Sequence, residues 1–299
     1  MPRWFLWSLF AVFCWGLWAV IPKLIGTALT AGQSQMLSTL GLLPVMIALA
    51  VSKRFAVSGN RKRGVSAAFC AGTLAGAANT AYYHALQLGG KAATLVSLTA
   101  LYPVVTILLA MLVLRERLNR IQCVGLLLSL SAIWLFNVAS VSGVEGTIAA
   151  WIVWAIIPIV LWGVAGLLQK ISTNHVSGEL STLWFLAAFV PVGIVMWLLQ
   201  PLPGPVPPRI WLLVVTLGLF FGLGNLAILL AFAHSGKASV ITPLTGLYSI
   251  VSVPAAILFF GEKVSTREWA AIGLALAAVV ALSRETPDRP PNPSTARSL

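Results

Sequence analysis

Charged residues are scarce in this sequence, and acidic residues are the scarcest among them. Only 9% of the 299 residues are charged, with 7 Asp and Glu against 19 Lys and Arg, whereas 59% are hydrophobic and the mean hydropathy is +0.95. Such a chain has too little polar surface to cover a soluble globule. Its apolar runs are roughly 20 residues long, which suits helices that cross a hydrocarbon core, and they lack the alternation of a membrane β-barrel. The composition therefore predicts an all-α integral membrane protein in contact with a lipid bilayer.

The lack of acids also limits the chemistry of the protein. All seven acids lie between apolar runs, at their ends or in the C-terminal tail, which disfavours proton coupling, a cationic substrate and intramembrane aspartyl proteolysis. No Arg lies within an apolar run, and this argues against a phosphorylated substrate. Cys14, Cys70 and Cys123 show no metal-ligand spacing, so we interpret them as packing residues. With no nucleotide-binding loop either, we expect no catalytic residue, cofactor, metal or ATPase subunit.

Ten apolar stretches predict ten transmembrane helices. They lie near 4–22, 33–51, 65–88, 92–114, 119–139, 148–169, 180–199, 209–233, 238–260 and 265–283. If the N-terminus is cytoplasmic, fourteen basic residues fall on the cytoplasmic side and five on the other. This asymmetry follows the positive-inside rule and predicts that both termini are cytoplasmic. The net charge of +12 then requires no nucleic-acid partner.

The second half of the sequence repeats the first. A gapless shift of 146 residues aligns 72–116 with 218–262, with 16 of the 45 positions identical, and a shift of 147 aligns Trp15 with Trp162. The identical pairs include Asn79/Asn225, Thr99/Thr245 and Tyr102/Tyr248. Each copy holds five predicted helices, and an odd number gives the copies opposite orientations across the membrane. Inverted repeats of this kind typically hold a substrate site at their interface, near the middle of the bilayer.

This repeat also predicts the organisation of the chain. We expect the first five-helix repeat at 1–139, an outer connector at 140–147, the second repeat at 148–283 and a disordered cytoplasmic tail at 284–299.

Two short motifs recur in the copies. A Trp-Gly pair lies near the middle of the first and sixth predicted helices, and an acid, Glu116 or Glu262, ends the fourth and ninth ahead of a Gly-rich helix. In these motifs the chain resembles the EamA-type, ten-helix branch of the drug/metabolite transporter superfamily over nearly its whole length. It departs from the family's Gly-Glu in the first copy, where Arg115 precedes Glu116. The resemblance implies a transporter in the plasma membrane, or bacterial inner membrane, and within the branch it points to exporters of aromatic amino acids.

Polar and aromatic side chains inside the predicted helices are the candidate substrate contacts. They are Trp15, Asn79, Tyr82, Tyr83, His84, Thr99, Tyr102, Trp162, Asn225, Thr245 and Tyr248. A structural hydrogen bond, between helices or to the backbone, is the alternative role for each polar side chain, and lipid contact or packing is the alternative for the tryptophans. Tyr82 and Tyr83 lie three and four residues after Asn79 and hence on its helix face, whereas the second copy has Ile228 and Leu229 there. We expect substrate specificity at such departures from the repeat.

Glycines and prolines at fixed places in these helices have a different predicted role. Gly72 with Gly76, and Gly218 with Gly222, form GxxxG pairs that let helices approach closely. Pro103, Pro243 and Pro254 are expected to kink their helices and to leave backbone carbonyls without their usual donors.

Together these features predict a transporter, not an enzyme. A site without charge suits neutral, partly apolar molecules, and the resemblance agrees with amino acids, aromatic ones included. We expect an exporter or facilitator that works by alternating access without an obvious coupling ion. The alternatives are a multidrug or metabolite exporter and, less favoured, a channel, a lipid flippase or an intramembrane enzyme.

Overall fold

The computed structural model describes residues 3–52, 54–113, 119–141, 150–202, 204–234, 238–282 and 284. These residues are almost entirely helical. In chain order the helices are α1 (Arg3–Ile25), α2 (Ala31–Ser38), η1 (Thr39–Leu42), α3 (Leu43–Ser52), α4 (Arg61–Gln87), α5 (Ala92–Thr99), α6 (Pro103–Val113), α7 (Arg120–Val141), α8 (Ala150–Thr173), α9 (Gly178–Ala187), α10 (Phe189–Leu199), α11 (Pro208–Ala233), α12 (Ala238–Gly246), α13 (Ser249–Phe260) and α14 (Thr266–Leu282). The predictions for Glu116, for most of the connector and for the tail beyond Arg284 fall outside the described residues.

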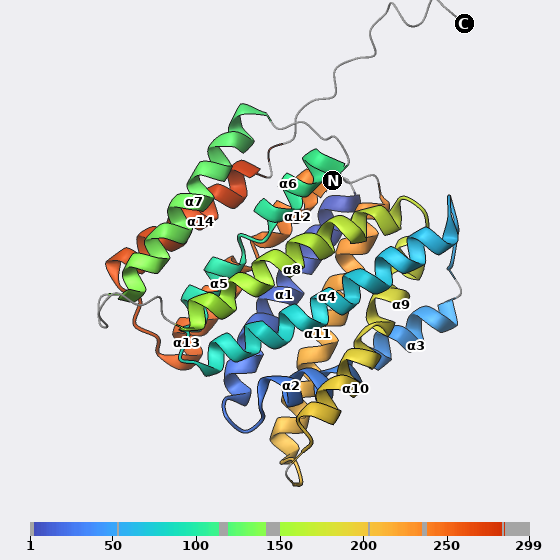
Figure 1. The fold of residues 1–299 in the computed structure, drawn as a ribbon, viewed down its shortest axis with the longest axis horizontal. Coiled ribbons are helices and arrows are strands. Elements are labelled where there is room, and N and C mark those ends of the chain that lie inside the picture. Colours follow the sequence, from blue (N-terminus) through green and yellow to red (C-terminus); the bar gives the residue numbers. More distant parts are fainter. Residues whose placement is uncertain are drawn as a thin grey trace, which may run out of the picture.

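Helices occupy the described part of all ten predicted spans, either as one helix or as two or three consecutive ones (Figure 1). Seven stretches within the described residues are long and apolar enough to cross a membrane, and α4, α7 and α14 are not among them. α4 begins with three basic residues and is rich in Ala and Gly, and α14 has only 17 residues. The protein is therefore all-helical and multi-pass, while the total of ten crossings stays a prediction.

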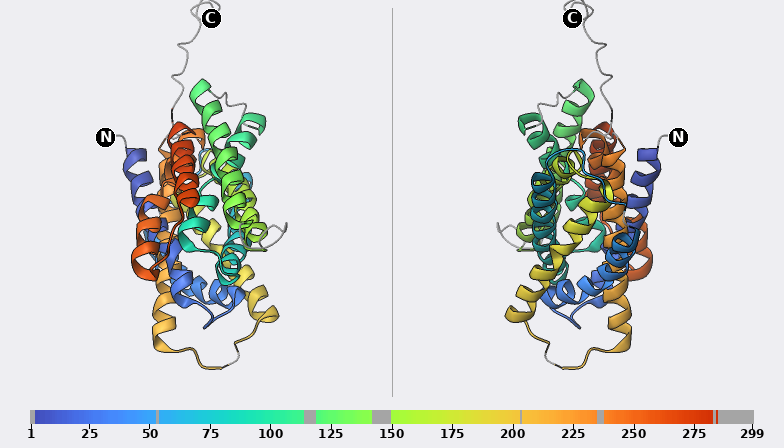
Figure 2. Two further views of the ribbon diagram at one scale, coloured as in Figure 1. Left: turned by 90° about the vertical axis from the view of Figure 1, so that its left-hand side faces the viewer. Right: turned by 90° about the vertical axis from the view of Figure 1, so that its right-hand side faces the viewer.

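The two ends of the described chain lie on the same side of the bundle. α1 begins, and α14 ends, at the same end of the molecule (Figure 2). Which side of the membrane this end faces stays a prediction from the distribution of basic residues.

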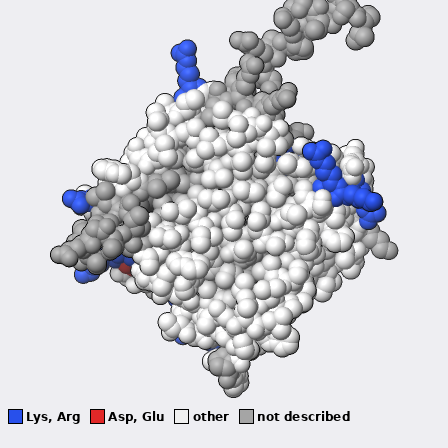
Figure 3. Space-filling view, viewed as in Figure 1, with Lys and Arg blue, Asp and Glu red and all other residues white. Residues whose placement is uncertain are grey.

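The outer surface of the bundle is apolar. Leu112, Leu258 and Leu198 are each more than 70% exposed, and water would strongly disfavour so many exposed aliphatic side chains. One face carries almost no charged side chain, and the Lys and Arg residues visible on it lie near its edges (Figure 3). Cys70 and Cys123 are also exposed, so the interpretation of the cysteines as packing residues is wrong for these two and fits only the buried Cys14.

Helices of the first copy pack against helices of the second copy, and equivalent helices form equivalent pairs. α4 lies along α8, and its repeat counterpart α11 lies along α1, while α7 and α14 lie side by side (Figure 1). A Cβ atom at Gly16 would overlap Val251 beside the carbonyl of Tyr248, and one at the equivalent Gly163 would overlap Val105 beside the carbonyl of Tyr102. Equivalent helices therefore make equivalent contacts between the two copies.

The GxxxG glycines lie where two backbones meet. A Cβ atom at Gly72 would overlap the carbonyl oxygen of Phe185, and one at Gly218 would overlap the carbonyl oxygen of Ser38. One turn further on, Gly76 faces Val192, and Gly222 faces Leu42 and Val45. Glycine lets the helix axes come close enough for these carbonyl contacts.

Two helix breaks face each other in the middle of the bundle. The first separates α5 from α6 just before Pro103, and the second separates α12 from α13 at Leu247 and Tyr248. Pro103 has no N–H to donate to the carbonyl of Thr99, so this carbonyl lacks its usual donor and instead accepts from the N–H of Tyr102 at 3.1 Å. In the second copy the break lies between Pro243 in α12 and Pro254 in α13 instead of at either proline.

Candidate functional site

A small cavity lies between the two copies. It is lined by Trp15, Trp18, Ala75, Tyr102, Trp162, Ala165, Gly166, Gln169, Phe185, Phe221, Asn225, Ile228, Thr242 and Tyr248. None of these lining side chains carries a charge. The cavity has a volume of about 50 Å³, which is room for only a few water molecules. A larger molecule therefore requires the surrounding rings to move apart.

Aromatic rings form most of the wall on one side of the cavity. Trp18 packs edge-on against Trp162, with ring centroids 5.7 Å apart, and lies 5.5 Å from Phe221. Tyr102 meets Trp162 edge-on at 6.1 Å. Such offset and edge-to-face arrangements bury large apolar surfaces and leave ring faces available to an apolar ligand.

The adjacent pair Tyr82 and Tyr83 lies behind Trp18 and does not line the cavity. The ring of Tyr82 stacks on Trp18 at 5.3 Å, and its hydroxyl donates to the carbonyl of Ala19 at 2.7 Å. The hydroxyl of Tyr83 accepts a 3.3 Å hydrogen bond from the indole N–H of Trp18. Both tyrosines therefore support the position and orientation of Trp18.

His84, the third candidate in this part of α4, also lies away from the cavity. Its ring packs edge-on against Trp154 at 4.5 Å and is partly exposed. The reason is helical geometry, because a residue five positions after Asn79 is rotated well away from the face that Asn79 occupies.

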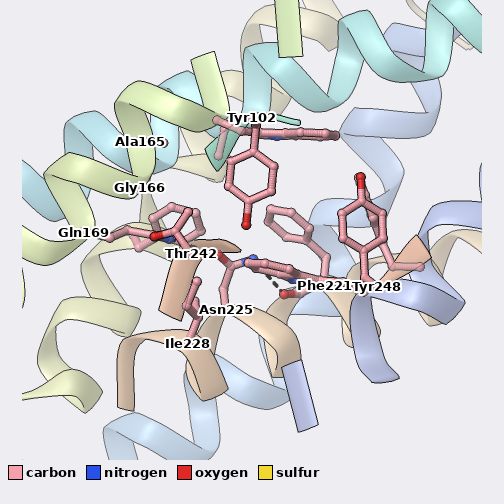
Figure 4. A pocket seen from close by; sticks show the side chains of 14 residues that line it. Tyr102, Ala165, Gly166, Gln169, Phe221, Asn225, Ile228, Thr242 and Tyr248 are labelled. Carbon is pink, nitrogen blue, oxygen red and sulfur yellow. Dashed lines mark hydrogen bonds between the residues drawn. The ribbon is translucent and has the colours of Figure 1, made fainter. Parts of the chain in front are cut away.

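The two repeat-related tyrosines lie at the helix breaks and make reciprocal hydrogen bonds. Tyr102 pairs with Thr245 at 3.1 Å, and Tyr248 pairs with Thr99 at 3.2 Å. Each bond joins one copy to the other beside the cavity. Figure 4 shows the hydroxyl of Tyr102 pointing toward the middle of the cavity, with Gln169, Thr242 and Asn225 on one side and Tyr248 on the other.

The repeat-related pair of asparagines is used differently in the two copies. Asn79 accepts a 3.1 Å hydrogen bond from the indole N–H of Trp162. Asn225 instead accepts a 3.1 Å hydrogen bond from the side-chain amide of Gln169, and its own amide donates to the carbonyl of Phe221. The two copies therefore hold their equivalent tryptophans, Trp162 and Trp15, in different ways.

Five of the eleven candidate residues thus line the cavity, namely Trp15, Tyr102, Trp162, Asn225 and Tyr248. Asn79, Thr99 and Thr245 lie one layer behind and bond to lining residues.

Four other side chains line the cavity, although the sequence does not predict them as substrate contacts: Trp18, Gln169, Thr242 and Phe221. A signal for Gln169 does exist in the sequence, since it follows Trp162 by seven residues and hence shares its helix face.

A group of charged residues ties the copies together at the end where α1 finishes. Lys23, at the end of α1, forms an ion pair with Glu262, and Glu262 also accepts hydrogen bonds from the backbone N–H groups of Ala92 and Ala93 at 2.7 and 2.9 Å. These N–H groups form the first turn of α5, where a carboxylate is favoured by the helix dipole. Lys91 pairs with Glu268 at 2.8 Å. In both ion pairs an acid of the second copy holds a lysine of the first.

Metal binding finds no support in the described part of the chain. No group of three or more His, Cys, Asp and Glu side chains comes together there in a way that would hold a metal ion.

A two-copy helical membrane protein with an uncharged cavity between its copies belongs to the class of small-molecule carriers built from repeats. The family is shown by sequence: residues 2–138 and 149–284 each match the EamA-like transporter family, and the chain belongs to that family. The chain is also similar to a solved crystal structure, with a TM-score of 0.65 and 18% identity over 93% of this chain and 96% of the other. That likeness concerns the fold. No curated protein matches the chain significantly.

Proposed function

We propose that this protein carries neutral, partly apolar small molecules, amino acids and especially aromatic amino acids among them, across the plasma membrane or bacterial inner membrane. The observation that carries the proposal is the chemistry of the cavity between the copies. Its wall combines tryptophan and phenylalanine rings with uncharged amide and hydroxyl groups. Aromatic faces suit an apolar ring or chain, and they also attract an ammonium group through cation–π contact. The resemblance of the chain to the aromatic amino-acid exporter YddG agrees with this chemistry.

Transport is proposed to proceed by alternating access. The cavity in this state has room for only a few water molecules, and the helix breaks between α5 and α6 and between α12 and α13 lie beside it. Hydrogen bonds and ion pairs join the copies around it. Such bonds can break and reform as one copy rocks against the other. No acid lines the cavity, so we propose that the carrier needs no proton for coupling and that substrate gradients drive it.

An apolar drug or metabolite is the second candidate substrate, because the same aromatic wall would accept it. The two substrate classes differ in polar groups, and a competition assay separates them. Inhibition of phenylalanine uptake by neutral amino acids would support the first class, and inhibition by apolar drugs alone would support the second.

Reconstitution in liposomes tests the proposal. We expect saturable uptake of labelled phenylalanine, acceleration by unlabelled phenylalanine on the opposite side, and no dependence on a pH gradient. Flux that does not saturate would contradict a carrier and favour a channel. Accumulation that follows the proton gradient would contradict uncoupled transport.

A further inference from the structure

Two residues that line the cavity each have a buried polar atom without a hydrogen-bond partner. These atoms are the indole Nε1 of Trp15 and the hydroxyl oxygen of Thr242. The Thr242 side chain is 0% exposed, and Trp15 and Thr242 lie on α1 and α12, which contact each other. Leaving a buried polar group unpaired costs about 1–3 kcal/mol. A partner that the protein itself does not supply is therefore expected in the cavity.

The repeat explains why Trp15 is unpaired. Its counterpart Trp162 donates to Asn79, and the same arrangement in the other half would have Trp15 donate to Asn225. The edge of the Trp15 ring does lie against Gly224, the neighbour of Asn225. In this half, however, the side-chain oxygen of Asn225 is turned to accept from Gln169, and the indole N–H of Trp15 makes no bond to it.

Two residues of the second copy, Gln169 and Thr242, differ here from their counterparts in the first copy. Gln169 stands where the first copy has Pro22, which has no side-chain donor, and Thr242 stands where the first copy has Val96. The second copy has thus gained one side chain that diverts Asn225 away from Trp15 and another that adds a hydroxyl group. The first copy has neither of these groups at the equivalent positions.

The chemistry of these atoms selects the group that would bind them. An indole N–H only donates, and a threonine hydroxyl can donate as well, so the pair suits an acceptor oxygen. We propose that Trp15 and Thr242 form a subsite for a carbonyl or carboxylate oxygen of the carried molecule, whose apolar part packs against the rings of Trp18, Trp162 and Phe221. This inference rests on the proposed function, because it assigns an orientation to a substrate in the same cavity.

Binding of three related probes tests the subsite in purified protein. L-Phenylalanine and L-phenylalaninamide carry an acceptor oxygen, and phenethylamine is the same molecule without it. Trp15→Phe and Thr242→Val should each weaken binding of the first two probes by about tenfold, the equivalent of ~1.4 kcal/mol. Phenethylamine binding should change by less than about twofold, because it makes no bond to either group.

Two further variants separate the subsite from general packing. Trp162→Phe removes an indole N–H that is already bonded to Asn79, so it should weaken all three probes alike. Gln169→Leu should free Asn225 to accept from Trp15, and so reproduce the loss seen in Trp15→Phe. Combining Gln169→Leu with Trp15→Phe should cause no further loss.

The proposal is overturned if Trp15→Phe and Thr242→Val weaken the three probes equally, or if the wild type binds all three with the same affinity or none of them. Thr242→Ser keeps the hydroxyl group and should retain the preference, which guards against a Thr242→Val protein that does not fold. Because the measurement is of binding, it is independent of flux. A wild type that binds with this preference but does not transport phenylalanine would contradict the proposed function and not the subsite.

Discussion

The two copies agree at the contacts where their helices pack and differ at several of the side chains that line the cavity. Gly72 and Gly218 meet equivalent backbone carbonyls, and Tyr102 and Tyr248 make reciprocal hydrogen bonds. Around the cavity, by contrast, the repeat aligns Trp18 with Ala165, Phe221 with Ala75 and Thr242 with Val96. The copies therefore share their packing contacts and part of the cavity wall, the pairs Trp15/Trp162 and Tyr102/Tyr248, whereas the diverged positions add the rings of Trp18 and Phe221 and the hydroxyl of Thr242.

The packing glycines provide the largest expected effect. Gly72→Leu should prevent folding or cost several kcal/mol of stability, because the added side chain would overlap the carbonyl of Phe185. Gly218→Leu should cost about as much, if the copies are equivalent at this contact. Detergent-solubilised yield and melting temperature measure the effect. Gly273→Leu is the control, since nothing lies within 4 Å of a Cβ there, and an equal loss in the control would contradict the account.

The two ion pairs are a second difference between the copies, because both acids belong to the second copy and both lysines to the first. Glu262→Gln should weaken the closure of this end by about 1–3 kcal/mol, because the charge that holds Lys23 and the first turn of α5 is lost. A free-energy change of this size corresponds to about a 5- to 150-fold change in an equilibrium constant. A cysteine introduced at Ala92 should therefore be labelled about 5- to 150-fold faster. Arg267→Gln, at an exposed side chain on the same end, is the matched control. Unchanged labelling in Glu262→Gln would show that the ion pair does not hold this end closed.

The reciprocal tyrosine bonds test how closely the copies correspond. Tyr102→Phe and Tyr248→Phe should each lower the stability by about 1 kcal/mol, because each loses one hydrogen bond to a threonine of the other copy. Combining Tyr102→Phe with Thr245→Val should cost less than the sum of the single changes. Chemical denaturation of the four proteins measures this coupling, and strict additivity would mean that the bond contributes nothing.

The smallest effect is expected behind the aromatic wall. Tyr83→Phe removes the acceptor for the indole N–H of Trp18 but leaves every lining side chain in place. We expect a change of about twofold to fivefold in the KM of transport with a similar maximal rate, since the bond orients Trp18 without contacting substrate. Loss of the maximal rate would instead place Tyr83 directly in the transport step.

Much of the fold could be predicted from the sequence, because the apolar runs and the 146-residue repeat are local or periodic signals. The candidate site was predicted less well. The repeat points to Trp15, Trp162, Tyr102 and Tyr248, which line the cavity, whereas the polar pair Tyr82 and Tyr83 lies behind Trp18. Which of two side chains on one helix face reaches a cavity depends on the neighbouring helices, and periodicity carries no such information. The roles of Gln169 and Thr242 became visible only through the partners they have or lack.

If molecules cross the membrane through the cavity between the copies, a side chain that fills the cavity should stop transport. Ala75 lines the cavity from α4, where the second copy has Phe221, and Ala77 on the same helix is exposed on its outer side. Counterflow of labelled phenylalanine should therefore be lost in Ala75→Phe and retained in Ala77→Phe, with both proteins folded to the same melting temperature. Equal counterflow in the two variants would contradict the account.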